Sequence, residues 1–241
     1  MFAKVEGMDV YYERHDGVGT PVVLMHGWGC RVDTMRRVFD KLSGIGKTVV
    51  AFDFTGFGRS DPPFRPFSVY DYARVTLGFF SALGLVKPDV IAHSFGGRVA
   101  IILASENLVN RVLLVDAAGV KPRFDLGRSL KISAYKFRIK LGLKTDKCGS
   151  TDYRALDGVM RETFVKVVNE HLDELLPLVT RPTLLVWGEN DRDTPLYMAK
   201  RMKRKITDSA LVVMKNCGHF SFLDDTESFT AVASAFFEEE K

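Results

Sequence analysis

One segment of the sequence restricts the fold more than any other, because it places a serine where a strand turns sharply into a helix. The apolar run 89–92 predicts a buried strand, and the stretch 98–104 predicts a buried helix. Between them, the small residues Ala92 and Gly96 flank Ser94, two positions away on either side. So tight a turn strains the serine backbone and excludes bulky flanking side chains. The segment predicts a nucleophile elbow, although an ordinary strand-to-helix turn around a serine shows the same local pattern.

The other groups that a serine nucleophile needs have candidates later in the chain. Attack at neutral pH requires a general base and a carboxylate that orients this base. Asp191 lies in the loop after the predicted strand 183–187, and His219 lies in the loop after the predicted strand 211–214. Because the carboxyl ends of parallel strands meet along one edge of a sheet, we expect Ser94, Asp191 and His219 to converge there.

The predicted oxyanion donors are the backbone amides of Trp28 and Phe95. Trp28 follows the apolar strand 21–25, and Phe95 directly follows the nucleophile. Removing one oxyanion donor typically costs about 3 kcal/mol of transition-state stabilisation. Substituting either side chain removes no amide, so we expect it to change the shape of the pocket instead. For both rings, packing in the core is nearly as good an interpretation as lining the pocket.

Strands and helices alternate along most of the chain, which indicates a mostly parallel sheet with helices on both faces. The first expected element is an antiparallel hairpin that includes residues 10–14. The other elements expected outside the site are strands at 48–52 and 112–115 and helices at 34–42, 69–83 and 226–237.

The alternation stops between Gly119 and Thr180, where apolar residues recur at helical spacing without intervening strands. The two series are Leu130, Ala134, Phe137 and Leu141, and then Tyr153, Leu156, Met160, Phe164 and Val167. They predict two or three inserted helices.

Together these motifs resemble those of the α/β-hydrolase fold superfamily over nearly the whole chain. The matching pieces are His26-Gly27-Trp28-Gly29, the run 53–60, the elbow around Ser94, the run 187–191 and Gly218-His219. The resemblance implies an α/β fold with an eight-stranded, mostly parallel sheet and a helical cap inserted after strand 6. It assigns residues 1–118 and 181–241 to the hydrolase core and 119–180 to the cap, within one overall domain. The one departure is Ala92, where glycine is usual.

The resemblance also implies a role for each candidate residue. Ser94 is the expected nucleophile, His219 the general base and Asp191 the acid that orients His219. Asp191 followed by Pro195 fits the family spacing best. The alternatives to Asp191 are Asp193, two positions on, and Asp116, at a place where some relatives carry this acid.

Composition limits the classes of protein that this chain could be. With 241 residues, of which 46% are hydrophobic, it is long enough for one substantial core. No apolar run approaches the length of a membrane span, and residues 1–6 lack the core of a signal peptide. Three cysteines without a CxxC pair fit a reducing cytoplasm best, and we expect Cys217 to pack rather than react.

Positive charge is concentrated in one part of the chain, whose formal net charge is +4. Between positions 121 and 147, two acidic residues oppose nine basic ones: Lys121, Arg123, Arg128, Lys131, Lys136, Arg138, Lys140, Lys144 and Lys147. No aromatic strand platform or recognition helix accompanies them, so a nucleic-acid partner is not expected. A solvated helix face is the simpler explanation, and docking of an acidic partner is the alternative. A second basic cluster, 200–205, is predicted on a surface helix.

No cofactor or metal is expected. The histidines and acids lack ligand spacings such as HExxH, and the scattered cysteines form no zinc motif. Neither a GxGxxG nor a Walker phosphate loop occurs.

The predicted function is hydrolysis of a small or medium acyl substrate, most simply a carboxylic ester, through an acyl-enzyme on Ser94. Carbon–carbon bond hydrolysis and thioester hydrolysis use the same three residues and remain open. The run 26–29 and the basic cap also resemble the pimeloyl-carrier-protein methyl-ester esterases, which implies an acidic carrier protein as a possible partner. From another class of protein, the alternative is a ligand-sensing receptor with a hydrolase fold and little turnover.

Overall fold

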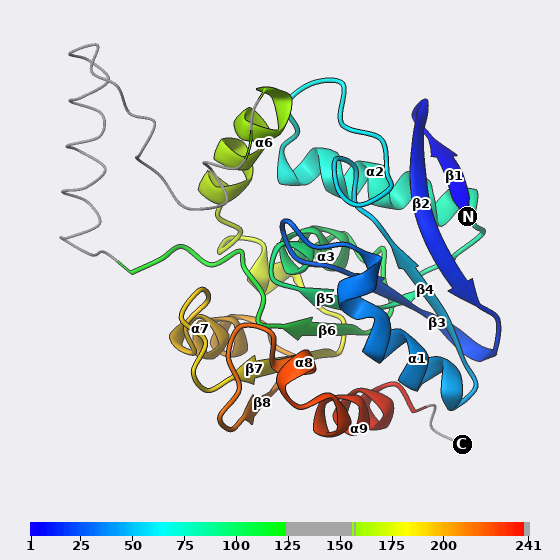
Figure 1. Ribbon diagram of the computed structural model, residues 1–241. Coiled ribbons are helices and arrows are strands. Elements are labelled where there is room, and N and C mark those ends of the chain that lie inside the picture. Colours follow the sequence, from blue (N-terminus) through cyan, green and yellow to red (C-terminus); the bar gives the residue numbers. More distant parts are fainter. Residues whose placement is uncertain (124–155, 157, 239–241) are drawn as a thin grey trace, which may run out of the picture.

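The computed structural model describes residues 1–123, 156 and 158–238, which form an eight-stranded sheet with helices on both faces (Figure 1). The strand order is β1-β2-β4-β3-β5-β6-β7-β8. Antiparallel pairing joins β1 to β2 and β2 to β4, and the neighbours from β4 to β8 all pair in parallel. The expected eight-stranded, mostly parallel sheet is confirmed. The strands are β1 (Phe2–Val5), β2 (Met8–His15), β3 (Val18–Met25), β4 (Lys47–Phe52), β5 (Asp89–His93), β6 (Val112–Val115), β7 (Thr183–Gly188) and β8 (Ser209–Met214).

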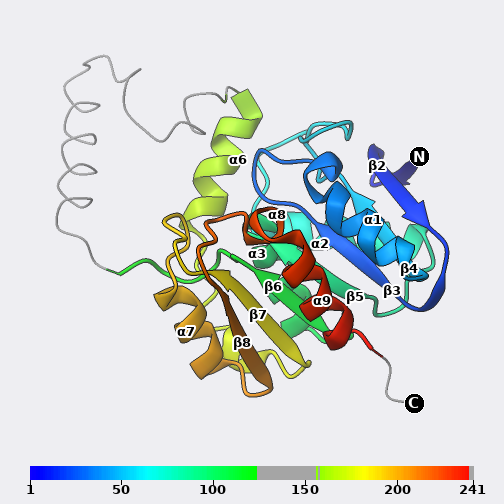
Figure 2. The ribbon, with the colours of Figure 1, turned by 60° about the horizontal axis from the view of Figure 1, so that its bottom comes forward.

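Helices cover both faces of the sheet (Figure 2). Helices α1 and α9 lie on one face, while α2, α3 and α7 lie on the other. None of the helices in the described ranges is long and apolar enough to cross a membrane. The helical elements are η1 (Val32–Met35), α1 (Arg36–Gly44), α2 (Val69–Ala82), α3 (Phe95–Ser105), α6 (Gly158–Asn169), η2 (Leu176–Leu178), α7 (Tyr197–Lys205), α8 (Ser221–Asp224) and α9 (Thr226–Phe236).

The apolar strands divide their side chains between two cores, one on each face. In β3, Val22 and Leu24 pack in the core formed with α1 and α9, whereas Val23 and Met25 pack in the core formed with α2 and α3. Successive residues of a strand point to opposite faces, and both faces here are covered by helices. This explains why the central strands are near-continuous apolar runs in the sequence rather than alternating ones.

The elements predicted outside residues 119–180 are present, with shifts of a few residues at their ends. The helix expected at 34–42 begins as the 3₁₀ turn η1 and continues as α1 to Gly44. Strand β8 begins at Ser209, two residues before the predicted start. Helix α2 begins where expected because Ser68 and Asp71 form a capping box with each other's backbone amides.

In the described part of the chain between β6 and β7 there are helical elements and no strand. Of the second predicted helix, Met160, Phe164 and Val167 lie in α6 and Leu156 precedes it. The first predicted cap helix and Tyr153 lie outside the described residues. So does the basic segment expected to meet an acidic partner, apart from Lys121 and Arg123.

Helix α6 packs against the loops that follow β3 and β4 through contacts of several kinds. The Thr163 hydroxyl accepts a hydrogen bond from the Phe67 amide at 3.0 Å, and the Phe164 ring lies 5.2 Å from the Trp28 ring in an edge-to-face arrangement. A Cβ atom on Gly56 would lie 2.5 Å from the Met160 sulfur. The loop before α2 therefore approaches α6 closely at a residue without a side chain.

The strand that leads to Ser94 is anchored at its other end by a buried ion pair. Asp89, the first residue of β5, has a side chain only 1% exposed, and its Oδ2 lies 2.7 Å from Arg111 Nη2. The Arg111 guanidinium also donates to carbonyl oxygens at the end of α9, including that of Phe236 at 3.2 Å. Arg111 thus connects the start of β5 with the end of α9, the last helix of the chain.

We expect Asp89→Ala to lower the free energy of unfolding by about 3 kcal/mol, because it leaves the Arg111 charge without its buried partner. Urea unfolding followed by circular dichroism measures this change. As a control, Lys4→Ala breaks the exposed Lys4–Asp9 pair and should leave the midpoint within error. Equal destabilisation by both substitutions would contradict an anchoring role for Asp89.

Candidate active site

Ser94 occupies a strained turn between β5 and α3. Its backbone has φ +47° and ψ −108°, in a region that residues with side chains rarely adopt. A Cβ atom on Gly96 would lie 2.7 Å from the Met25 carbonyl oxygen, and one on Gly97 would lie 2.4 Å from the Ala117 Cβ. Ala92 is fully buried. The small residues around Ser94 are therefore required by the close approach of α3 to the ends of β3 and β6.

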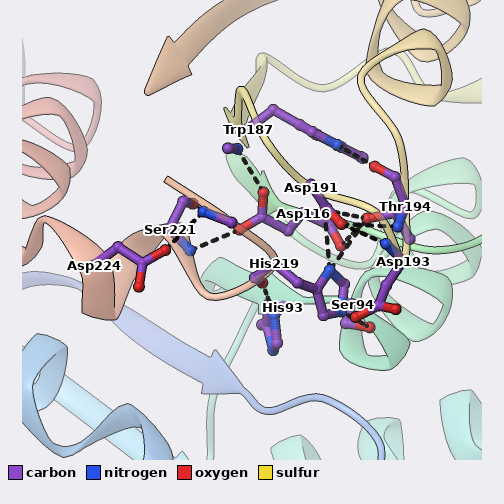
Figure 3. A network of polar contacts seen from close by, with 12 residues as sticks. His93, Ser94, Asp116, Trp187, Asp191, Asp193, Thr194, His219, Ser221 and Asp224 are labelled. Atoms are coloured by element: carbon purple, nitrogen blue, oxygen red, sulfur yellow. Dashed lines mark hydrogen bonds and ion pairs between the residues drawn. The ribbon is translucent and has the colours of Figure 1, made fainter. Parts of the chain in front are cut away.

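The structure brings Ser94, His219 and Asp191 together in one line of hydrogen bonds (Figure 3). Ser94 Oγ lies 3.0 Å from His219 Nε2, and His219 Nδ1 lies 2.9 Å from Asp191 Oδ2. An ionised Asp191 accepts from Nδ1–H, which leaves the Nε2 lone pair facing the Ser94 hydroxyl. This is the tautomer that a general base for Ser94 needs.

Asp191 is buried and held by groups of its own loop. Its Oδ1 accepts hydrogen bonds from the amides of Asp193 at 2.8 Å and Thr194 at 2.9 Å. Its Oδ2 lies 2.6 Å from the Thr194 hydroxyl. Burial raises the pKa of Asp191, but the hydrogen bonds from His219 and Thr194 outweigh it and lower the pKa below its usual value. Asp191 is therefore ionised at neutral pH.

His219 has a raised pKa. Burial lowers the pKa of the imidazole, and the hydrogen bond and charge of Asp191 more than offset this, with the charges of Asp193 and Asp116 adding to the increase. A neighbouring carboxylate thus stabilises the imidazolium that forms when the ring takes a proton.

The two alternative acids occupy other positions. The Asp193 carboxylate is exposed and acts on His219 through its charge. Asp116 is fully buried; its Oδ1 accepts from the Gly188 amide at 2.7 Å, and its Oδ2 lies 2.6 Å from the Ser221 hydroxyl. Burial raises the pKa of Asp116 to about 7. Of the three candidates, Asp191 is the one hydrogen-bonded to the His219 ring.

Trp28 and Phe95 place their amides at two turns next to Ser94. Trp28 lies in a turn closed by the Cys30 amide, which donates to the Gly27 carbonyl oxygen at 3.2 Å, so the turn does not use the Trp28 amide. Phe95 is the first residue of α3, and the first amides of a helix have no partner within it. A Cβ atom on Gly27 would lie 3.3 Å from the Ser94 Cβ, which puts the first turn directly against the nucleophile.

The side chains of these two residues have different surroundings. The Phe95 ring is buried among aromatic residues, 4.9 Å from the Tyr72 ring and 5.1 Å from the Phe54 ring. Trp28 is half-buried and lies between Phe95 of the core and Phe164 of α6. Core packing is thus the better description of the Phe95 ring, while the Trp28 ring lies between the core and α6.

Several residues that support the line of hydrogen bonds were not singled out from the sequence as supports. The Trp187 indole donates to the Thr194 carbonyl oxygen at 2.6 Å and fixes the loop that carries Asp191. His93, the residue before Ser94, lies with its Nε2 2.8 Å from the carbonyl oxygen of His219. Burial lowers the pKa of His93 to about 3, so the ring is neutral and donates from Nε2–H. The position of His93 beside the nucleophile was the only signal in the sequence for such a role.

One group of possible metal ligands occurs within the described ranges. Atoms of Asp191, Asp193 and His219 lie within 4.8 Å of one another. His219 Nδ1 and Asp191 Oδ2 are already hydrogen-bonded to each other, so metal binding there would break the line that reaches Ser94.

Comparison with known proteins identifies the family. A family model described as the alpha/beta hydrolase family matches residues 22–232. The chain belongs to this family. A 2-hydroxy-6-oxo-2,4-heptadienoate hydrolase of Pseudomonas putida is 28% identical to this chain, covering 92% of this chain and 91% of the relative. The 2-hydroxy-6-oxo-6-(2'-aminophenyl)hexa-2,4-dienoic acid hydrolase of Metapseudomonas resinovorans is 26% identical, covering 98% and 89%.

The fold is shared with solved structures of this family. An esterase from Exiguobacterium antarcticum superposes with a TM-score of 0.79 at 23% identity, covering 98% of both chains. At that identity the likeness establishes the fold alone.

We expect Asp191→Asn to lower kcat on a nitrophenyl ester about 10⁴-fold, because an amide at this position favours the wrong tautomer of His219. Asp193→Asn is the matched control: it removes an exposed charge and should change the plateau kcat less than tenfold. A large loss in Asp193→Asn or Asp116→Asn, with Asp191→Asn still active, would assign the orienting role to another acid.

The pKa of His219 should set the acidic limb of the pH profile of kcat/KM. The ring must be neutral to accept the Ser94 proton, so kcat/KM should fall as pH decreases through a value above 6.5, the ordinary pKa of histidine. Asp193→Asn removes a charge that raises this pKa, so the limb should move to lower pH. If the acidic limb of Asp193→Asn stays at the same pH, or moves to higher pH, it does not report the pKa of His219.

Proposed function

We propose that this chain is a serine hydrolase that cleaves a small or medium acyl substrate, most simply a carboxylic ester, through an acyl-enzyme on Ser94. The observation that carries the proposal is the unbroken line from Ser94 Oγ through His219 to Asp191, with contacts of 3.0 and 2.9 Å. Nucleophile, base and orienting acid are already within hydrogen-bond distance, and the nucleophile is held in a strained turn.

Acylation follows from this geometry. As Ser94 Oγ attacks the acyl carbonyl carbon, its proton moves to His219 Nε2, and the carbonyl π electrons move to the oxygen. The amides of Trp28 and Phe95 donate hydrogen bonds to this oxyanion. When the intermediate collapses, the bond to the alcohol oxygen breaks and the leaving group takes the proton from Nε2. The acyl group is then esterified to Ser94.

Deacylation repeats these steps with water as the nucleophile. His219 Nε2 accepts a proton from water as its oxygen attacks the acyl carbon, and the second oxyanion uses the same two amides. Collapse breaks the bond to Ser94 Oγ, which recovers its proton from Nε2. The acid is released and the hydrogen bonds of the resting enzyme are restored.

The relatives favour hydrolysis of a carbon–carbon bond as the second candidate. The two that share 28% and 26% identity are named as hydrolases of 2-hydroxy-6-oxo-dienoic acids. These names describe carboxylic acids that carry a ketone and no ester, so their hydrolysis separates carbon from carbon. Ser94, His219 and the two amides would serve that reaction as well, because it also passes through attack at a carbonyl.

We expect the wild type to hydrolyse nitrophenyl esters, and Ser94→Ala to lose at least 10³-fold in kcat because the nucleophile is absent. Nitrophenolate release across acyl chains of two to eight carbons measures both the turnover and the depth of the pocket. A parallel assay with a 2-hydroxy-6-oxo-dienoic acid compares the two bond types.

A fluorophosphonate probe, with mass spectrometry of the labelled peptide, gives an independent readout. Labelling of Ser94 in the wild type, and its absence in Asp191→Asn over the same time, is the expected result. Binding of acyl compounds without any turnover dependent on Ser94 would contradict the hydrolase proposal and favour a ligand-sensing role.

A further inference from the structure

Beside the loop that carries Asp191 there is a cavity of about 470 Å³ that the mechanism above does not use. Its walls are formed by the segment that follows β6, by the end of α6, by α3, and by the start of α7 with the loop before it. In Figures 1 and 2 the chain after β6 passes between α6 and α7. Pockets of several hundred Å³ are large enough for a small organic group.

The charged residues of this cavity are mainly basic. Arg98, Arg123, His171 and Arg192 line it, and Asp193 is the acidic residue in its lining. Asp193 belongs to the part of the wall next to His219, whose pKa its charge raises. A bound anion is therefore favoured at the arginine side of the cavity and repelled from the side next to the general base.

Arg98 is the most informative of these residues because it is a buried cation. It lies on α3, one helical turn after Ser94, and is 9% exposed. Its guanidinium donates to the carbonyl oxygen of Glu170, and in the described part of the chain no carboxylate lies within ion-pair distance of it. Burial lowers the pKa of Arg98 to about 10, which still leaves it charged at neutral pH.

The charge of Glu170 raises the pKa of Arg98 but forms no ion pair with it, so burial of the guanidinium remains costly, and an anion in the adjoining cavity would reduce this cost. The planar fork of an arginine fits a carboxylate especially well because it can donate two parallel hydrogen bonds. The neighbouring cations support the same ligand. Arg192 is exposed, and Arg123 lies over the Tyr197 ring at 4.4 Å from its centroid.

The wall of the cavity is in direct contact with the proposed active site. Ala118, which lines the cavity, donates its amide to the Ser94 carbonyl oxygen at 2.9 Å. Thr194, also in the wall, lies 2.6 Å from Asp191 Oδ2. The cavity therefore adjoins the residues that hold the Ser94 backbone and the Asp191 carboxylate.

We propose that this cavity is a subsite for a carboxylate group of the substrate, with Arg98 as its principal cation. The inference rests on the proposed hydrolase function and makes it more specific: the preferred substrates carry a negative charge at a distance from the scissile carbonyl. The carboxylate can belong to the acyl group or to the leaving group.

Two matched pairs of esters test the proposal. The first pair is the mononitrophenyl ester of adipate and nitrophenyl hexanoate, which differ in a carboxylate on the acyl side. The second pair is the hexanoate esters of 3-hydroxybenzoate and 3-hydroxybenzamide, which differ in a carboxylate on the leaving-group side. In at least one pair, Arg98→Gln should lower the ratio of kcat/KM for the anionic ester to that for the neutral ester at least tenfold.

One further test variant and one control variant test the proposal even if Arg98→Gln folds poorly. Arg192→Glu, at an exposed cavity position, should lower the same ratio about threefold or more. Lys203→Gln removes an exposed positive charge from α7, is not among the residues lining the cavity, and should leave the ratio unchanged. Ratios unaltered by both arginine substitutions in both pairs, or lowered equally by Lys203→Gln, would overturn the subsite.

A binding experiment separates this proposal from the hydrolase proposal. Calorimetric titration of the Ser94→Ala protein with adipate and with adipamide needs no turnover. Adipate should bind at least tenfold tighter than adipamide, and Arg192→Glu in the same background should weaken adipate binding. If no ester is hydrolysed but adipate binds in this way, the hydrolase proposal fails and the subsite stands. Equal binding of adipate and adipamide overturns the subsite whatever the turnover.

Discussion

The close approach of helix α3 to the ends of β3 and β6 is the constraint on which the other features of the site depend. With no side chain at Gly96 or Gly97, the helix begins almost in contact with the Met25 carbonyl oxygen and the Ala117 Cβ. The chain passes from β5 into this helix through Ser94, whose backbone is strained at φ +47° and ψ −108°. A bulkier residue at 96 or 97 would move the helix away and take the serine hydroxyl out of reach of His219.

Two buried carboxylates organise the other side of the site, and their surroundings give them different states. Asp191 receives two backbone amides and the imidazole, which lowers its pKa and keeps it ionised beside His219. Asp116 is more deeply buried, and its pKa rises to about 7 although Gly188 and Ser221 donate to it. Asp116 thereby links the end of β7 to the loop after His219. Asp191 is hydrogen-bonded to the His219 ring, and Asp116 joins the end of β7 to the loop that follows His219.

The surroundings of Ser94 divide into an apolar part and a charged part. Trp28 and Phe164 bring the core and α6 together through an aromatic contact. Toward α7, the lining of the adjoining cavity is mainly basic and includes the buried Arg98 of α3. Aromatic surface accepts hydrocarbon, whereas a desolvated guanidinium favours an anion. A substrate with an apolar body and a distant carboxylate would match both parts.

The sequence by itself determined the fold class, the approximate positions of the strands, and Ser94 and His219 as two of the residues that meet at the sheet edge. Apolar runs buried on both faces, and loops that follow parallel strands, are local patterns that do not depend on distant contacts. The boundaries of α1 and β8 shifted because 3₁₀ turns and strand pairing depend on neighbours in space. The tertiary structure alone decided that Asp191, rather than Asp193 or Asp116, bonds to His219, and that His93 holds the His219 backbone. It also decided that Arg98 is buried beside a cavity. These facts depend on the distances between loops far apart in the chain, and such distances are set by packing rather than by any local pattern.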